Sequence, residues 1–199
     1  MKANIEARFV ENIARVKNLT DLYRIHLMGR GSGRRGHSKT DVLRAAVVML
    51  HASMEDLLRS IEYWKLPSAN SAVLANIPLA SKGPATKFNL GDLVAHRGQT
   101  VEDVISKSVD EHLERSNYNN GDDLAAFCGN VGIDVTRVNS HFSRIEPVMK
   151  RRHQIVHRAD RDNQASGRGR HQVTSIGVAT VNTWISSIEK FGQAVLNEV

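Results

Sequence analysis

The sequence predicts an all-α fold, an up-and-down bundle of helices with an irregular helical insert between the second and third long helices. Long stretches of the chain place apolar residues three, four and seven positions apart, which is the spacing of an amphipathic helix. Runs of alternating apolar and polar residues, the pattern of a half-buried strand, do not exceed about four residues. No internal repeat or coiled-coil heptad is sustained, so neither a solenoid nor a sheet-based architecture is expected.

Two long helices open the predicted bundle. The first runs from Ile5 to Leu27, and the second opens with Ser38 and Asp41 in capping-box spacing and continues until Pro67. Because each helix carries one apolar face, we expect the two to pack as an antiparallel pair. Their predicted core residues are Ile5, Phe9, Ile13, Val16, Tyr23, Leu27, Leu43, Ala46, Val47, Leu50, Met54, Leu57, Leu58 and Ile61.

An irregular insert is expected at residues 66–99, where prolines and glycines break the helical pattern. One short helix is predicted inside it, from Asn89 to His96. Thr100 and Asp103 have capping-box spacing and mark the start of the next long helix. The apolar face of that helix is predicted to hold Val101, Val104, Ile105, Val109 and Leu113.

The last part of the chain is predicted to hold one short helix and two long ones. The turn Asn119-Asn120-Gly121 precedes the short helix at 122–129, and Asp134 can cap the helix after it. Pro147 lies inside that helical pattern, so we expect a bend there. A polar basic loop at 159–171 then leads into the final helix. The predicted inward residues are Val135, Val138, Phe142, Ile145 and Met149 on the first long helix, and Val173, Ile176, Thr180, Trp184, Ile188, Phe191 and Val195 on the second.

The composition indicates one globular domain over residues 1–199. A chain of this length with 41% hydrophobic residues can bury a substantial core. It has no apolar run near eighteen residues and its first residues lack the pattern of a secretory signal, so we expect a cytoplasmic protein without a membrane span. Cys128 is the single cysteine, cannot form an internal disulfide, and is predicted to be a small buried residue.

The chain carries a formal net charge of +6 and a pI near 9.7, a balance that favours a polyanionic partner. The charge is concentrated between Lys150 and His171. This segment has seven basic and two acidic residues, which together supply +5 of the total. A second basic stretch, from Gly29 to Lys39, either reaches over a phosphate backbone or is simply an exposed loop. The segment after Lys150 is therefore the main candidate for a binding site.

His153 and His157 lie four residues apart in that segment and would share one face of a helix, a spacing that also suits a metal site. No third ligand lies nearby in the sequence, and the surrounding arginines oppose a divalent cation. We therefore expect neither a metal nor another cofactor.

The same segment holds groups suited to the cleavage of RNA. Histidine can move protons near neutral pH, and arginine offers a permanent cation whose planar fork matches two phosphate oxygens. The nucleophile in such a reaction is the 2'-hydroxyl of the substrate, so RNA is cut and DNA is not. The alternative is a solvated basic helix end in which Arg152 pairs with Asp160 or Asp162.

The stretch from Arg151 to Arg161 resembles the Arg-x4-His signature of HEPN domains, and most closely the RiboL-PSP HEPN branch. A second stretch, from Leu50 to Arg59, is similar to the acidic early helix of that family. The resemblance covers nearly the whole chain. It implies a HEPN-like fold and a metal-independent endoribonuclease that leaves a 2',3'-cyclic phosphate and a 5'-hydroxyl, acting as a bacterial toxin or phage-defence effector.

Two other functions stand beside this one. A non-catalytic HEPN module would bind RNA, a nucleotide or a protein partner through the same basic segment. A basic helical DNA-binding protein is disfavoured, because the sequence has no clear helix-turn-helix spacing.

The resemblance also implies roles for individual residues. Arg152 and His157 match the catalytic arginine and histidine of the motif, and His153 fills the polar position after the arginine. Glu55 or Asp56 matches the acidic residue that orients the arginine, and the alternative for either is an ion pair within its own helix. The basic residues expected to contact RNA are Lys150, Arg151, Arg158 and Arg161.

HEPN domains generally act as symmetric dimers, so the resemblance implies a homodimer in which Arg152 and His157 of both chains share one cleft. On a regular helix, five residues turn the chain by about 140°, so these two side chains would not face one phosphate within a single straight helix. A second copy, or a distortion at Pro147, would resolve this. An antitoxin or regulatory protein is a further expected partner. Ala159 stands where related toxins carry a modified tyrosine, so silencing at that position is not expected.

Overall fold

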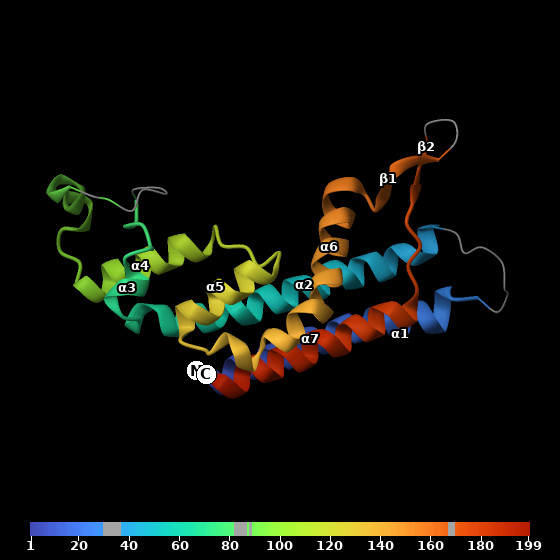
Figure 1. Ribbon diagram of the computed structural model, residues 1–199, viewed down its shortest axis with the longest axis horizontal. Coiled ribbons are helices and arrows are strands. Elements are labelled where there is room, and N and C mark those ends of the chain that lie inside the picture. The colour runs from blue at the N-terminus through green and yellow to red at the C-terminus, as the bar shows by residue number, and fades with distance from the viewer. Residues whose placement is uncertain (30–36, 82–86, 88, 167–169) are drawn as a thin grey trace.

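The fold is mainly helical (Figure 1). The computed structural model describes residues 1–29, 37–81, 87, 89–166 and 170–199. The prediction of an all-α fold is confirmed, with one small β-hairpin added to the helices. Within the residues described, no helix is both long and apolar enough to cross a membrane.

The first two helices form the antiparallel pair that the sequence predicts. α1 (Lys2–Leu22) continues into a π-helical turn at Tyr23–Leu27, and α2 (His37–Lys65) runs back along α1 (Figure 1). The predicted core residues on both helices are at most 6% exposed, except Leu27, which is half-buried. α2 begins one residue before Ser38, so Ser38 does not stand at the predicted capping position.

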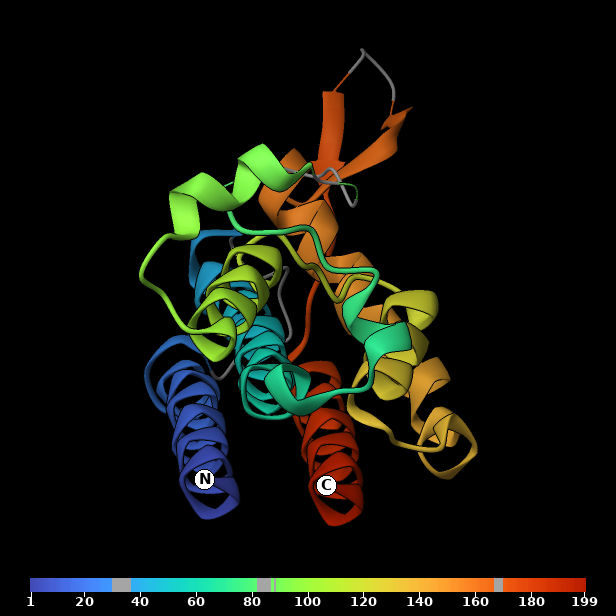
Figure 2. The ribbon, with the colours of Figure 1, turned by 90° about the vertical axis from the view of Figure 1, so that its left-hand side faces the viewer.

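The last helix, α7 (Val178–Glu198), lies beside α1 and runs antiparallel to it, so both chain ends lie at the same end of the bundle (Figures 1 and 2). Its predicted inward face is partly wrong, because Thr180 is exposed and Trp184 is only half-buried. The predicted face is counted from Val173, but this residue lies in a strand. Its spacing from the later residues therefore does not show which of them share a face of the helix. The buried residues of α7 are Val181, Ile185, Ile188, Phe191, Gly192, Val195 and Leu196.

The insert after α2 lies at the end of the bundle far from the hairpin (Figure 1). It holds a 3-10 turn at Leu66–Ser68, α3 (Ser71–Leu74) and a 3-10 helix at Leu90–His96. The short helix predicted in this region is therefore present, in the tighter 3-10 form.

α4 (Val101–Leu113) begins with the predicted capping box. The hydroxyl of Thr100 accepts a hydrogen bond from the backbone N–H of Asp103 at 3.1 Å, and the Asp103 carboxylate accepts one from the N–H of Thr100 at 3.0 Å. Leu113 is buried as predicted. Val101 is 69% exposed, because the first residue of the helix faces solvent before the helix reaches the core.

α5 (Gly121–Val131) and α6 (Phe142–Arg158) lead from the insert to the hairpin. Asp134 caps a 3-10 turn at Val135–Arg137, and not the long helix that the sequence predicts to follow it directly. A second 3-10 turn precedes α6. Pro147 lies inside α6 without interrupting it, since the helix continues to Arg158.

A β-hairpin follows α6 where the sequence predicts a polar basic loop at 159–171. β1 (Arg161–Ser166) and β2 (Arg170–Val173) pair antiparallel. Ala159 and Asp160 have φ angles of 48° and 60°, so the chain leaves α6 through two successive left-handed residues that reverse its direction. The hairpin projects away from the bundle at the end of α6 (Figures 1 and 2).

A buried carboxylate, Glu62, joins α2 to α5. Its side chain accepts hydrogen bonds from the Tyr118 hydroxyl and, at 2.9 Å, from the Asn130 amide, and the residue is 2% exposed. Burial raises the pKa of Glu62 above its usual range, although both hydrogen bonds oppose the shift.

We expect the substitution Glu62→Gln to remove a pH dependence of the stability of the protein. Because the folded-state pKa of Glu62 is raised, its contribution to stability is full below the unfolded pKa of about 4.5 and is lost as the pH rises through the folded pKa. The glutamine variant does not titrate, so its melting temperature relative to wild type should rise by roughly a few degrees between about pH 4 and pH 8. Thermal melts across this range measure the difference. Glu146→Gln, which removes an exposed carboxylate on α6, is the control, and parallel curves for Glu62→Gln and wild type would contradict the prediction.

Candidate active site

The two neighbouring arginines of α6, Arg151 and Arg152, lie in different surroundings. The guanidinium of Arg151 donates from Nη2 to Asp160 Oδ2 at 2.8 Å and to the carbonyl oxygens of Thr174 and Ser175 at 3.0 and 3.1 Å. Its side chain is 13% exposed. The guanidinium of Arg151, one of the predicted RNA contacts, is therefore bonded to groups of the protein itself.

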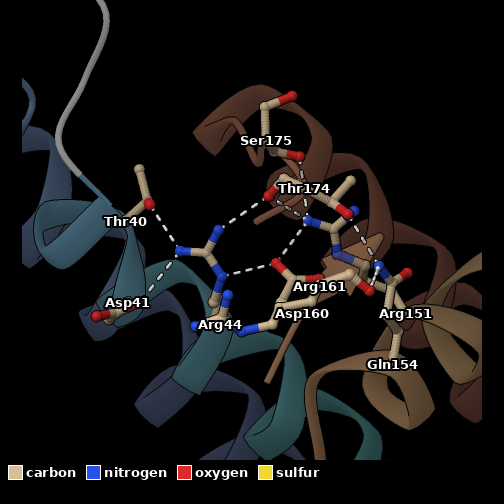
Figure 3. Close-up of polar contacts among 9 residues, drawn as sticks. All are labelled: Thr40, Asp41, Arg44, Arg151, Gln154, Asp160, Arg161, Thr174 and Ser175. Atoms are coloured by element: carbon tan, nitrogen blue, oxygen red, sulfur yellow. Dashed lines mark hydrogen bonds and ion pairs between the residues drawn. The ribbon is translucent and has the colours of Figure 1, made fainter. Parts of the chain in front are cut away.

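Arg44 of α2 reaches the same carboxylate from the opposite side (Figure 3). Its Nε donates to Asp160 Oδ2 at 2.6 Å, and its Nη2 donates to the Thr174 carbonyl at 2.9 Å. Thr40 and Asp41, one turn earlier on α2, accept from Nη1 at 2.7 and 3.1 Å. Asp160 is fully buried. We call Arg44, Arg151 and Asp160 the Asp160 clamp.

The Asp160 clamp joins α2, α6 and the base of the hairpin. The backbone N–H of Thr174 donates to the Asp160 carbonyl at 2.8 Å and closes the hairpin base. Gln154 of α6 adds two bonds, from Nε2 to Thr174 Oγ1 at 2.8 Å and to the Arg161 carbonyl at 3.3 Å (Figure 3). The direction in which the hairpin leaves α6 is thus held by contacts from two helices.

The structure also distinguishes the two candidate acidic residues on α2. Asp56 faces α1, where its Oδ2 lies 3.0 Å from Arg8 Nε and accepts from Asn12 Nδ2 at 3.2 Å. Glu55 is half-buried, and the charge of Arg152 on α6 acts on its carboxylate. Asp56 is bonded to α1, so Glu55 is the better candidate for an interaction with Arg152.

Glu55 is held in its ionised form. Burial, the largest influence, would raise its pKa, but the contact with His51 and the positive charge of Arg152 outweigh burial, so the pKa lies below its usual range. Arg59, the alternative partner within the helix, makes a smaller contribution to this shift. Its guanidinium donates to the carbonyl oxygens of Leu113 and Ser116 at 3.1 and 3.0 Å.

His51 lies one turn before Glu55 and is fully buried. Its Nδ1 is 3.5 Å from Glu55 Oε2, too long for a strong hydrogen bond, and its Nε2 has no hydrogen-bond partner among the residues that the structure describes. The sequence predicts no role for His51 or Arg44, and it offers Asp160 only as a possible partner of Arg152, whereas Asp160 binds Arg44 and Arg151. A usable signal was present for His51 and Arg44, because these polar residues interrupt the apolar face of α2.

The two histidines of α6 lie on the exposed side of the helix. The ring centroids of His153 and His157 are 4.5 Å apart with an angle of 45° between the planes. Both residues are exposed, and so is the apolar side chain of Val156, at 49%. Ile155 packs against the core and anchors this stretch. No cluster of three or more histidine, cysteine or acidic side chains suited to a metal occurs in the described part of the chain.

The remaining predicted RNA contacts lie near these histidines in the chain. Arg158 and Arg161 are exposed, and the Lys150 side chain is 74% exposed with its ammonium 2.8 Å from Glu146 Oε1. Arg152 is half-buried. The arrangement therefore combines an arginine whose charge acts on a half-buried carboxylate with two exposed histidines and several cations near them in the chain.

A family model described as RiboL-PSP-HEPN matches residues 10–199 of the chain. No curated protein and no solved structure shows a match.

Proposed function

The chain belongs to the RiboL-PSP-HEPN family, whose model covers residues 10–199, and from this premise we propose that it is a metal-independent endoribonuclease with Arg152 and His157 as its catalytic residues. The observation that carries the proposal is the difference between the two adjacent arginines. Arg151 is committed to the Asp160 clamp, whereas the positive charge of Arg152 acts on the carboxylate of Glu55 and lowers its pKa. A carboxylate in that position would hold the guanidinium in a fixed direction for phosphate binding.

In the proposed reaction the 2'-hydroxyl oxygen attacks the adjacent phosphorus and the bond from phosphorus to the 5'-oxygen breaks. The products are a 2',3'-cyclic phosphate and a 5'-hydroxyl. Histidine transfers the protons, taking one from the 2'-hydroxyl and returning one to the 5'-oxygen, and His157 is the residue assigned to this task. His153, whose ring touches that of His157, supports it. Arg152 binds the non-bridging phosphate oxygens as negative charge develops on them.

We propose further that the site is completed by a second copy of the chain. Arg152 and His157 are separated by about 140° around α6, so one helix does not direct both at the same phosphate. An exposed apolar residue, Val156, lies between the exposed histidines and offers apolar area to a symmetric contact. Two copies of α6 facing each other would bring an arginine of one chain toward a histidine of the other.

We expect Val156→Asp to weaken this dimer and to reduce RNA cleavage at low protein concentration, because a charge would be buried where two apolar side chains meet. Val10→Asp is the matched control, since Val10 is 61% exposed on α1 and outside the proposed interface. Sedimentation velocity and cleavage rates across a concentration series measure both effects. A monomer of full activity, or equal losses from the two variants, would contradict the prediction.

The reaction class is tested by offering purified protein RNA and DNA of the same base sequence in the presence of excess chelator. The proposal predicts that RNA is cut and DNA is left intact, because only RNA supplies the 2'-hydroxyl. A need for divalent cations would overturn it. Binding of RNA without any product, over a panel of structured and unstructured RNAs, would favour the non-catalytic module instead.

Membership of the family supports a biological role as a toxin or phage-defence effector that an antitoxin or regulatory protein restrains. Expression of the wild-type chain in bacteria should then arrest growth, whereas expression of His157→Ala should not. Equal growth of both cultures, at equal protein levels, would count against this role.

A further inference from the structure

The hairpin formed by β1 and β2 has few apolar residues. Ala165 and Val173 are the only apolar residues in the sequence of its two strands. A two-stranded hairpin is marginally stable by itself and is normally supported by an apolar face packed on a core. Packing therefore does not account for a hairpin that projects from the bundle (Figures 1 and 2).

The base of the hairpin is nevertheless held firmly. Asp160, at its start, receives bonds from Arg44 of α2 and Arg151 of α6, and the carbonyl of Thr174, at its end, receives bonds from the same two arginines (Figure 3). Burial of charged side chains is costly in free energy, and in some proteins such buried charges fix one geometry. The Asp160 clamp thus sets the direction of an otherwise weakly supported element.

The sequence of this segment is positively charged. Residues 161–173 include three arginines and one acidic residue, Asp162. The charge of Asp160, just before the segment, is already balanced, because its carboxylate is fully buried between Arg44 and Arg151.

The hairpin also begins close to the candidate catalytic residues. β1 starts four residues after His157. Gln154, less than one helical turn before His157, is bonded to both ends of the hairpin base. A polyanion bound along the hairpin would therefore lie beside the motif helix.

We propose that the β1–β2 hairpin is an arm that binds the phosphate backbone of RNA next to the cleavage site, and that the Asp160 clamp fixes the direction of this arm. The inference rests on the proposed function for the identity of the polyanion. Contacts of this kind position the strand without reading its sequence, and they make binding depend steeply on salt.

The test measures binding of a labelled single-stranded RNA by salt titration, with every protein carrying His157→Ala so that no cleavage occurs. Arg161→Gln with Arg170→Gln should weaken binding by about tenfold or more and make the slope of log affinity against log salt shallower by about 1.4, or 0.7 for each lost phosphate contact. Arg15→Gln with Arg97→Gln is the control, because it removes the same charge from α1 and the insert. An unchanged slope, or a loss no larger than that of the control pair, would overturn the proposal.

Asp160→Asn tests the clamp separately. If only the net charge of the protein matters, RNA affinity should change in one direction, and if the clamp fixes the arm, it should change in the other. The substitution makes the protein more positive by one charge, so charge alone predicts tighter RNA binding. Loss of the fixed arm predicts weaker binding, and tighter binding by the folded variant would overturn the role of the clamp. If the variant fails to fold, as circular dichroism would show, the arginine pair still decides the role of the arm. Failure of the parent chain to cut RNA would reject the proposed function alone, since the binding comparison involves no turnover.

Discussion

Arg151→Ala should lower the free energy of unfolding by about 1.5–3 kcal/mol, whereas Arg152→Ala should cost far less stability and abolish RNA cleavage. The first substitution removes one of the two arginines that bind Asp160 and one of the two arginine donors to the Thr174 carbonyl. The second removes the cation proposed to bind phosphate and leaves the clamp intact. Urea denaturation and chelator-resistant cleavage of RNA, measured on both variants, give the two quantities.

Lysine substitutions at the same positions are the matched controls. Arg152→Lys keeps the charge but loses the planar fork, so it should retain only part of the cleavage activity. Arg151→Lys should lose stability, because all three bonds come from the terminal Nη2, which the shorter lysine side chain does not reach with its ammonium. If both alanine variants lose stability equally, or if Arg152→Ala cleaves like wild type, the division of roles between the two arginines is wrong.

His157→Ala should lower the rate of RNA cleavage by about 10²- to 10⁴-fold, which is the usual contribution of a residue that transfers protons. Because His157 is exposed, its loss should change neither folding nor RNA affinity by more than a few-fold. Single-turnover kinetics at saturating protein, with binding measured on the same RNA, separate the two effects. His26→Ala, which removes an exposed histidine from the turn after α1, should leave the rate unchanged.

His153→Ala should lower the rate by a smaller factor, because this residue contacts His157 but is not assigned the proton transfer. A larger loss for His153→Ala than for His157→Ala would reverse the assignment of the two residues. Equal rates for wild type and His157→Ala would contradict the proposed mechanism.

The local features of the fold could be predicted because neighbouring residues determine them. The apolar faces of α1 and α2 follow from spacing alone, and the capping box of Thr100 and Asp103 is made within one turn of chain. The hairpin could not be predicted in the same way. Its strands lack the alternation of apolar and polar residues that signals a half-buried strand, and its base depends on a contact between Arg44 and Asp160, 116 residues apart.

The sequence predicts which segment holds the candidate site, but not which way each of its side chains points. Arg151 and Arg152 differ by one position, or about 100° around the helix, and the sequence does not say which direction leads into the core. The same ambiguity applies to Glu55 and Asp56 on α2. Only the packing of α2 between α1 and α6 decides that the charge of Arg152 acts on Glu55 and that Asp56 pairs with Arg8.

The ends of the RNA fragments released in chelator test the central claim most directly. If the 2'-hydroxyl is the nucleophile and His157 moves its proton, the wild-type chain should leave a 2',3'-cyclic phosphate on one fragment and a 5'-hydroxyl on the other, and a single 2'-deoxy nucleotide at the cut should block cleavage there. Mass spectrometry of the fragments identifies these ends. Fragments that carry 5'-phosphates, or a cut that persists at the 2'-deoxy position, would contradict the account.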